Sequence, residues 1–126
     1  MDRTQRQKLG IKKWVQNGGN GILVYAVGVG KTRTALTTCE MLYKQNPNIS
    51  ILISVPTAVL KEQWVIEAAK YPFFKNVKVE VINTIVKNTH NVDFLIIDEL
   101  HAALAATLVS IFDKVTYRYF LVLTGT

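Results

Sequence analysis

The chain has 126 residues, which is long enough for one compact domain and too short for two full ones. Apolar residues make up 49% of it and charged residues 19%, a balance that allows a buried core and excludes a disordered chain. The formal net charge is +6, and an excess of Lys and Arg favours a polyanionic partner, most commonly nucleic acid. A basic surface without any partner fits the charge equally well.

The sequence shows no sign of secretion or of membrane insertion. Polar and charged residues dominate positions 2–13, which argues against a signal peptide, and no apolar run approaches the ~20 residues that span a bilayer. The single cysteine, Cys39, has no partner for an internal disulfide, and buried packing is favoured over a reactive thiol. We therefore expect an intracellular protein, cytoplasmic in a bacterium or an infected host cell, with no membrane partner; a nuclear location stays open.

Apolar segments alternate with segments of helical pattern along the chain. The apolar segments are rich in Ile, Val, Leu and Phe and mostly lack polar alternation, which is typical of strands buried on both faces of a parallel sheet. The alternation predicts an α/β fold of three layers with a mainly parallel sheet. In chain order the predicted elements are helix 4–16, strand 21–26, helix 31–45, strand 50–55, helix 57–70, strand 77–82, a short turn of helix within 83–91, strand 93–97, helix 102–112 and strand 119–123.

The clearest motif follows the first predicted strand. Residues 26–32 read Ala-Val-Gly-Val-Gly-Lys-Thr and run into a predicted helix, which is the context of a P-loop. Gly28 and Gly30 let the backbone curl so that its N–H groups point at phosphate oxygens. Lys31 is predicted to reach the β and γ phosphates of ATP, and the Thr32 hydroxyl to bind Mg²⁺. The residues predicted to bind the nucleotide here are Val27, Gly28, Val29, Gly30, Lys31, Thr32 and Arg33.

The loop departs from the strict P-loop pattern at one position. The strict pattern has a glycine five residues before Gly30, where this chain has Tyr25. Because the strand, the later glycines and the helix are all in place, we prefer a P-loop to a chance Gly-Lys-Thr in an unrelated loop.

The fourth predicted strand ends in an acidic cluster, Asp98-Glu99-Leu100-His101. Ligands of α/β sheets bind beyond the carboxyl ends of the strands, so these acids lie where a magnesium nucleotide would bind. Asp98 is predicted to hold Mg²⁺, and Glu99 to orient and deprotonate the attacking water. His101 is predicted to couple this site to a neighbouring motif; an ordinary surface or helix-start role is the alternative.

The phosphate loop and Asp-Glu-Leu-His together resemble the motifs of superfamily 2 helicases of the DExH type, and the resemblance covers nearly the whole chain. It implies a RecA-like domain that couples hydrolysis of ATP to movement on nucleic acid. Val55-Pro56-Thr57, followed by Leu60 and Gln63-Trp64, resembles motif Ia. In that family the strand end and helix start of this motif contact the nucleic-acid backbone, which implies such a contact for Pro56 and Thr57. Ile82-Asn83-Thr84 resembles a second backbone contact, with Thr84 as the donor.

Two further segments extend the resemblance. Leu123-Thr124-Gly125-Thr126 resembles motif III in the form found in Swi2/Snf2-like and phage DNA helicases. This implies that the hydroxyls of Thr124 and Thr126 link the ATP state to the grip on nucleic acid, and it favours DNA over RNA. Gln7 resembles the glutamine that reads adenine, although a surface glutamine fits as well. Trp14 and Trp64 lie among apolar neighbours, so we expect core packing rather than base stacking.

The resemblance also implies a second RecA-like domain, in cis or in trans, that supplies arginines to the transition state. Such arginines accelerate related reactions by roughly 10³- to 10⁵-fold. We therefore expect residues 1–126, as a single RecA-like domain, to bind ATP weakly and to hydrolyse it very slowly. Two other classes stay open: a fragment of another P-loop ATPase, such as an AAA+ protein, and a non-hydrolysing module that binds a nucleotide or a partner.

Overall fold

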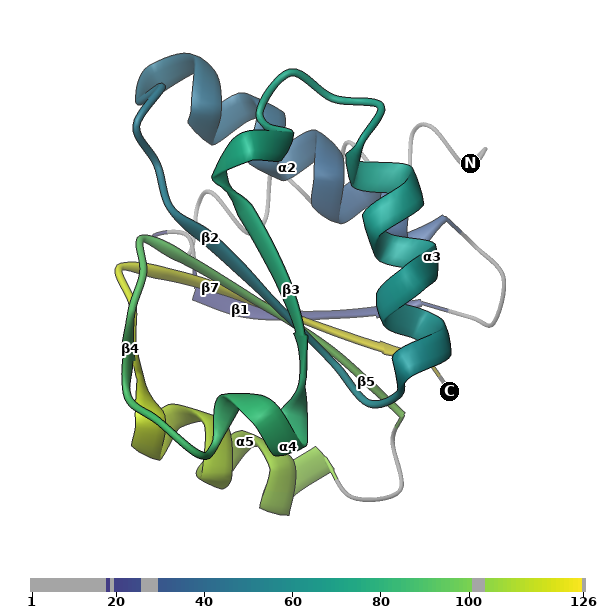
Figure 1. Cartoon of the computed structure of the whole chain (residues 1–126), viewed down its shortest axis with the longest axis vertical. Coiled ribbons are helices and arrows are strands. Elements are labelled where there is room, and N and C mark those ends of the chain that lie inside the picture. The colour runs from purple at the N-terminus through teal and green to yellow at the C-terminus, as the bar shows by residue number, and fades with distance from the viewer. Residues whose placement is uncertain (1–17, 19, 26–29, 101–103, 126) are drawn as a thin grey trace.

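A parallel sheet of five strands forms the centre of the molecule (Figure 1). The computed structural model describes residue 18 and residues 20–25, 30–100 and 104–125. The strand order is β1-β7-β5-β2-β3, and every pairing is parallel. All five predicted strands are therefore present, as β1 (Asn20–Tyr25), β2 (Ile51–Val55), β3 (Val77–Val81), β5 (Phe94–Leu100) and β7 (Tyr119–Gly125).

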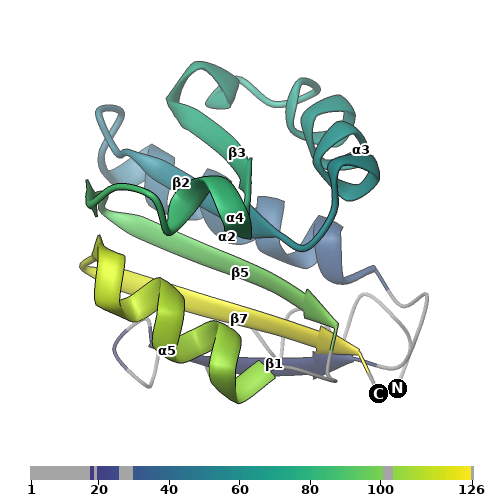
Figure 2. The ribbon, with the colours of Figure 1, turned by 60° about the horizontal axis from the view of Figure 1, so that its bottom comes forward.

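Helices cover both faces of this sheet (Figures 1 and 2). The helices α2 (Lys31–Gln45) and α3 (Ala58–Ala68) lie on one face, and α4 (Ile82–Ile85) and α5 (Leu104–Lys114) lie on the other. Successive strand residues alternate between the two layers, so Ile53 packs in the α2 and α3 layer while Leu52 packs in the opposite one. The predicted three-layer α/β architecture with a parallel sheet is thus confirmed.

The helix boundaries follow local signals in the sequence. The helix α2 spans the predicted residues and ends at Gln45. Its C-cap, Asn46, precedes Pro47 and is extended, as residues before proline prefer to be. Thr57 is the N-cap of α3, and its hydroxyl oxygen accepts a hydrogen bond from the Leu60 N–H at 3.2 Å. After α3 the chain passes through a short 3₁₀ helix, η1 (Phe74–Asn76), into the edge strand β3.

Two features in particular differ from the predicted elements. A second, two-stranded parallel sheet joins β4 (His90–Asn91) to β6 (Val115–Thr116), and two-residue strands are too short to show a periodic pattern. The helix α5 ends two residues later than expected, directly before β6. The helix predicted over residues 4–16, with Gln7 and Trp14, lies outside the described residues.

Within the described part of the chain, no helix has the length and apolar character needed to cross a membrane.

Candidate nucleotide-binding site

The start of α2 has the backbone geometry expected where a glycine loop meets a helix. Gly30 lies in the left-handed region, with φ 53° and ψ 29°, where a residue with a Cβ would be strained. Its carbonyl accepts hydrogen bonds from both the N–H and the hydroxyl of Thr34, at 3.0 and 3.1 Å. No acidic residue lies in the first turn of α2, so the positive end of the helix dipole is not offset there. This end of α2 is therefore suited to an anion.

Lys31 and Asp98, predicted from separate motifs, meet at this point. The Lys31 Nζ lies 2.7 Å from Oδ1 of Asp98, although 67 residues separate them along the chain. The Asp98 side chain is 3% exposed and that of Lys31 is 30% exposed. A buried carboxylate must be paired to be tolerated, and the lysine ammonium supplies that pairing.

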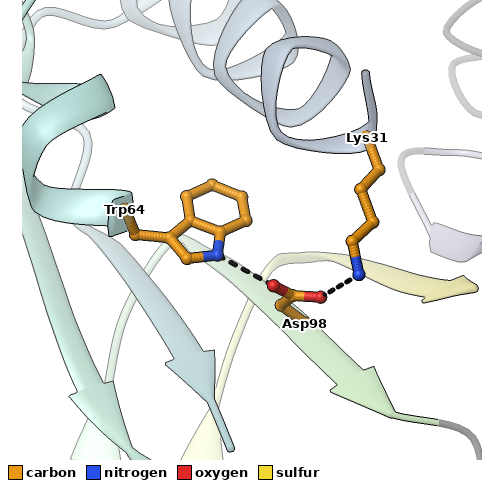
Figure 3. Close-up of polar contacts among 3 residues, drawn as sticks. All are labelled: Lys31, Trp64 and Asp98. Carbon is orange, nitrogen blue, oxygen red and sulfur yellow. Dashed lines mark hydrogen bonds and ion pairs between the residues drawn. The ribbon is translucent and has the colours of Figure 1, made fainter. Parts of the chain in front are cut away.

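Trp64 supplies a second donor to the same carboxylate (Figure 3). Its indole Nε1 donates to Oδ2 of Asp98 at 2.8 Å, and both residues are 2% exposed. The burial of Trp64 confirms the predicted core packing. The hydrogen bond to Asp98 was not predicted, because a tryptophan in an apolar helix pattern carries no sign of a partner 34 residues away.

A cavity of about 620 Å³ lies between the start of α2, the facing side of α3 and the end of β5. That volume falls within the ~300–1,000 Å³ range of small-molecule sites. Thr32 and Asp98 present hard oxygen ligands of the type that Mg²⁺ prefers, while Lys31 and the α2 N-terminus suit phosphate. The residues present therefore fit a magnesium nucleotide. The lining residues are Gly30, Lys31, Thr32, Arg33, Leu60, Gln63, Trp64, Ile66, Glu67 and Asp98.

The strand ends place two of the other predicted residues side by side. Glu99 is in register with Thr124, because β5 and β7 are neighbouring parallel strands. The acidic motif and the Thr-Gly-Thr segment thus reach the same edge of the sheet. The remaining predicted residues of the ATP site and of motif III, namely Gln7, Val27, Gly28, Val29, His101 and Thr126, lie outside the described residues.

The residues predicted to contact nucleic acid lie at the carboxyl edge of β2 and β3, which are adjacent strands. Pro56 is half-buried, whereas Thr57 and Thr84 are exposed. Thr57 has a structural role in addition to the predicted one, since its oxygen caps α3. Its hydroxyl hydrogen stays available, because the oxygen acts as the acceptor in that bond.

The fold is that of a RecA-like α/β domain, with a buried acid, Asp98, on β5 that pairs with Lys31 at the start of α2. The chain belongs to the family described as "Type III restriction enzyme, res subunit", whose model matches residues 1–92. It is thus a member of the superfamily 2 helicases and corresponds to their N-terminal RecA-like domain. No match was found among curated protein sequences.

Solved structures show the same fold at low sequence identity. The Sulfolobus solfataricus SWI2/SNF2 ATPase core domain has a TM-score of 0.78 and 17% identity, over 100% of this chain and 32% of that one. The UvsW helicase of bacteriophage T4 has a TM-score of 0.77 and 20% identity, over 95% of this chain and 51% of that one.

A third structure is a nuclease-deletion mutant of the Type ISP restriction-modification enzyme LlaGI, in complex with a DNA substrate mimic. It has a TM-score of 0.73 and 18% identity, over 100% of this chain and 17% of that one. The chain therefore spans about a third of the Sulfolobus ATPase core, about half of the phage helicase and a smaller share of LlaGI. It has the fold of a helicase-family ATPase domain.

Proposed function

We propose that this chain binds Mg-ATP at the start of α2 and acts as the first motor domain of a helicase or translocase. The observation that carries the proposal is the Lys31–Asp98 pair at 2.7 Å, because it joins the loop lysine and the strand acid in one pocket. An unrelated Gly-Lys-Thr loop has no reason to lie against a buried acid at the end of a parallel strand. Family membership supports the same function.

The roles proposed for the residues follow from their chemistry. Lys31 exchanges Asp98 for the β and γ phosphates when ATP binds, and the N–H groups of the loop and of the first turn of α2 hold phosphate oxygens. The side chains that would hold Mg²⁺ are Thr32 and Asp98. The ion, when bound, neutralises charge on the phosphates.

Hydrolysis requires a base, and we assign that role to Glu99. Its carboxylate accepts a proton from water as the water oxygen bonds to the γ phosphorus and the bond to the ADP oxygen breaks. Thr124, in register with Glu99, and Thr126 would carry the state of this site toward the nucleic acid. Gln7 would read the adenine edge, and His101 would join the acidic motif to motif III.

We propose double-stranded DNA as the partner. The structures with this fold include the Sulfolobus SWI2/SNF2 ATPase core in complex with dsDNA, with a TM-score of 0.72 and 17% identity, and LlaGI with its DNA substrate mimic. The net charge of +6 agrees with a polyanionic partner. Pro56, Thr57 and Thr84 would meet the DNA backbone at the edge of β2 and β3. A second RecA-like domain, in cis or in trans, would supply the arginines that the transition state needs.

The test is to measure ATP binding and ATP hydrolysis by this chain, alone and with double-stranded DNA, single-stranded DNA or RNA. We expect measurable Mg-ATP binding and a rate of hydrolysis near zero in every case, because the second domain is needed for the transition state. A chain that fails to bind ATP would contradict the proposed function. A robust rate stimulated by nucleic acid would contradict the need for a second domain.

A further inference from the structure

The two oxygens of Asp98 have different donors, which come from different helices of the same layer (Figure 3). Lys31 at the start of α2 bonds Oδ1 at 2.7 Å, and Trp64 within α3 bonds Oδ2 at 2.8 Å. The carboxylate is therefore held at both oxygens. Its orientation depends on an indole that belongs to neither of the two ATP motifs.

Packing alone explains the burial of Trp64 but not the identity of its partner. A buried indole N–H needs an acceptor, and a neutral backbone carbonyl would satisfy it. Here the acceptor is an ionisable side chain that is itself 3% exposed. Hydrogen bonds to a charged group are roughly twice as strong as neutral ones. This bond therefore restrains the orientation of the Asp98 carboxylate as well as providing the indole N–H with an acceptor.

The two donors are not equally free to move. The Lys31 side chain is 30% exposed and lines the cavity, so it is able to turn to an incoming phosphate. Trp64 is 2% exposed and packs in the core cluster that also contains Ala68 and Phe73. When Lys31 leaves Asp98, Trp64 is the donor that stays.

We propose that Trp64 is a positioning residue of the magnesium site. Its indole N–H holds Oδ2 of Asp98, so that Oδ1, the oxygen now bonded to Lys31, is the one offered to Mg²⁺. This inference rests on the proposed binding of Mg-ATP. Loss of a group that orients a metal ligand typically weakens metal affinity by about 10- to 100-fold.

The first test compares the wild-type chain with Trp64→Phe, which removes the N–H and keeps an aromatic ring. The dissociation constant of a fluorescent ATP analogue is measured in Mg²⁺ and in EDTA. The ratio of the two values is the gain in nucleotide affinity that Mg²⁺ provides. We expect Trp64→Phe to lower that gain about tenfold or more, because the loss of affinity in Mg²⁺ exceeds any loss in EDTA. Disturbed packing would instead weaken binding in both conditions.

Phe73→Leu is the matched control for packing. Phe73 is fully buried in the same cluster, its ring contacts are with Tyr43 and Tyr71, and it is not among the residues that line the cavity. We expect this variant to lower thermal stability and to keep the wild-type gain from Mg²⁺. An equal loss of the gain in Phe73→Leu and Trp64→Phe would overturn the positioning role.

A second measurement keeps the indole in place. The sequence has two tryptophans, so Trp14→Phe leaves Trp64 as the only one. We expect its fluorescence to change when ATP is added with Mg²⁺ and to change much less when ATP is added with EDTA. Identical spectra in the two conditions, or an unaltered gain from Mg²⁺ in Trp64→Phe, would overturn this inference alone. A wild-type chain that binds no ATP would overturn the proposed function as well.

Discussion

Glu99 on β5 lies in register with Thr124 on β7, one residue beyond the buried Asp98. Neighbouring parallel strands end at the same edge of a sheet, so the acidic motif and the Thr-Gly-Thr segment meet there although they are far apart in the sequence. This edge also receives the start of α2 with Lys31. The proposed base and the proposed coupling residue thus share one side of the molecule with the phosphate site.

Replacement of Glu99 separates binding from hydrolysis. Glu99→Gln removes the proposed base but keeps the size of the side chain, so we expect unchanged Mg-ATP affinity. With the second motor domain present, we expect phosphate release to fall by about 10²- to 10⁴-fold. Nucleotide binding and phosphate release are both measured on the same sample. Hydrolysis at the wild-type rate would rule out Glu99 as the base.

Thr57 caps α3 and is also a proposed contact to a DNA phosphate, and both roles use its hydroxyl group. Two substitutions test whether the hydroxyl, rather than the size of the side chain, is what matters. Thr57→Ala removes the N-cap of α3 and should lower the free energy of unfolding by about 1 kcal/mol. It should also weaken DNA binding, because the hydroxyl is the proposed phosphate contact. Thr57→Ser keeps the oxygen and serves as the control in both the denaturation and the DNA-binding measurements. If Thr57→Ala binds DNA as the wild type does, the proposal that the Thr57 hydroxyl contacts a DNA phosphate is contradicted.

Salt should weaken binding of DNA to this chain. Each phosphate neutralised by the protein releases counterions, so the logarithm of the affinity falls linearly with the logarithm of salt concentration. Fluorescence anisotropy of a labelled duplex over a series of salt concentrations gives the slope. A flat response would show that the chain neutralises no DNA phosphate with Lys or Arg, and it would contradict DNA as the polyanionic partner.

Cys39 should be an inert thiol in the folded protein. Burial raises the pKa of its thiol far above the ordinary value, so the thiol stays protonated and is a poor nucleophile. We expect slow labelling by iodoacetamide at pH 8 in the native state and fast labelling in urea, read by mass spectrometry on the only cysteine of the chain. Rapid labelling of the folded protein would contradict this burial.

The raised pKa of the Cys39 thiol should make the folded protein less stable at high pH. Because the pKa of Cys39 is raised on folding, its contribution to stability is complete below the unfolded value, near 9.0, and is lost as pH rises above it. Melting temperatures of wild type and Cys39→Ala, compared between pH 7 and pH 10.5, isolate this contribution. The wild type should lose more stability than the variant over that range.

The central strand β5 should be the most sensitive part of the core. Ile96 is fully buried between β2 and β7, and Ile96→Ala should lower the free energy of unfolding by about 2–5 kcal/mol. Val109 on α5 is 72% exposed, and Val109→Ala should change stability by no more than about 0.5 kcal/mol. Urea denaturation of both variants checks the contrast, and equal effects would argue against the described core.

The main elements were predictable because their signals are local and repeated. Apolar runs without polar alternation marked the five strands, and the Asn46-Pro47 pair marked the end of α2. The left-handed conformation of Gly30 agrees with its place in a glycine loop. By contrast, β4 and β6 are two residues each and exist through pairing across the fold, so no local pattern predicts them.

The candidate site was predictable in its residues and less so in its contacts. Lys31 and Asp98 follow from motifs, and their meeting follows from the topology of a parallel sheet. The bond from Trp64 to Asp98 depends on how α3 packs against β5, which the sequence around Trp64 does not specify. The helical pattern predicted that Trp64 is buried but not what its N–H would bind.

Mg-ATP binding by variants of two lysines on α2 tests the central claim most directly. Lys31 lies in the cavity against Asp98, whereas the Lys44 side chain is 74% exposed near the other end of the same helix and pairs with Glu40. We expect Lys31→Ala to abolish binding of a fluorescent ATP analogue in Mg²⁺, and Lys44→Ala to bind it as the wild type does. Wild-type affinity in Lys31→Ala would show that the nucleotide site is not at the start of α2.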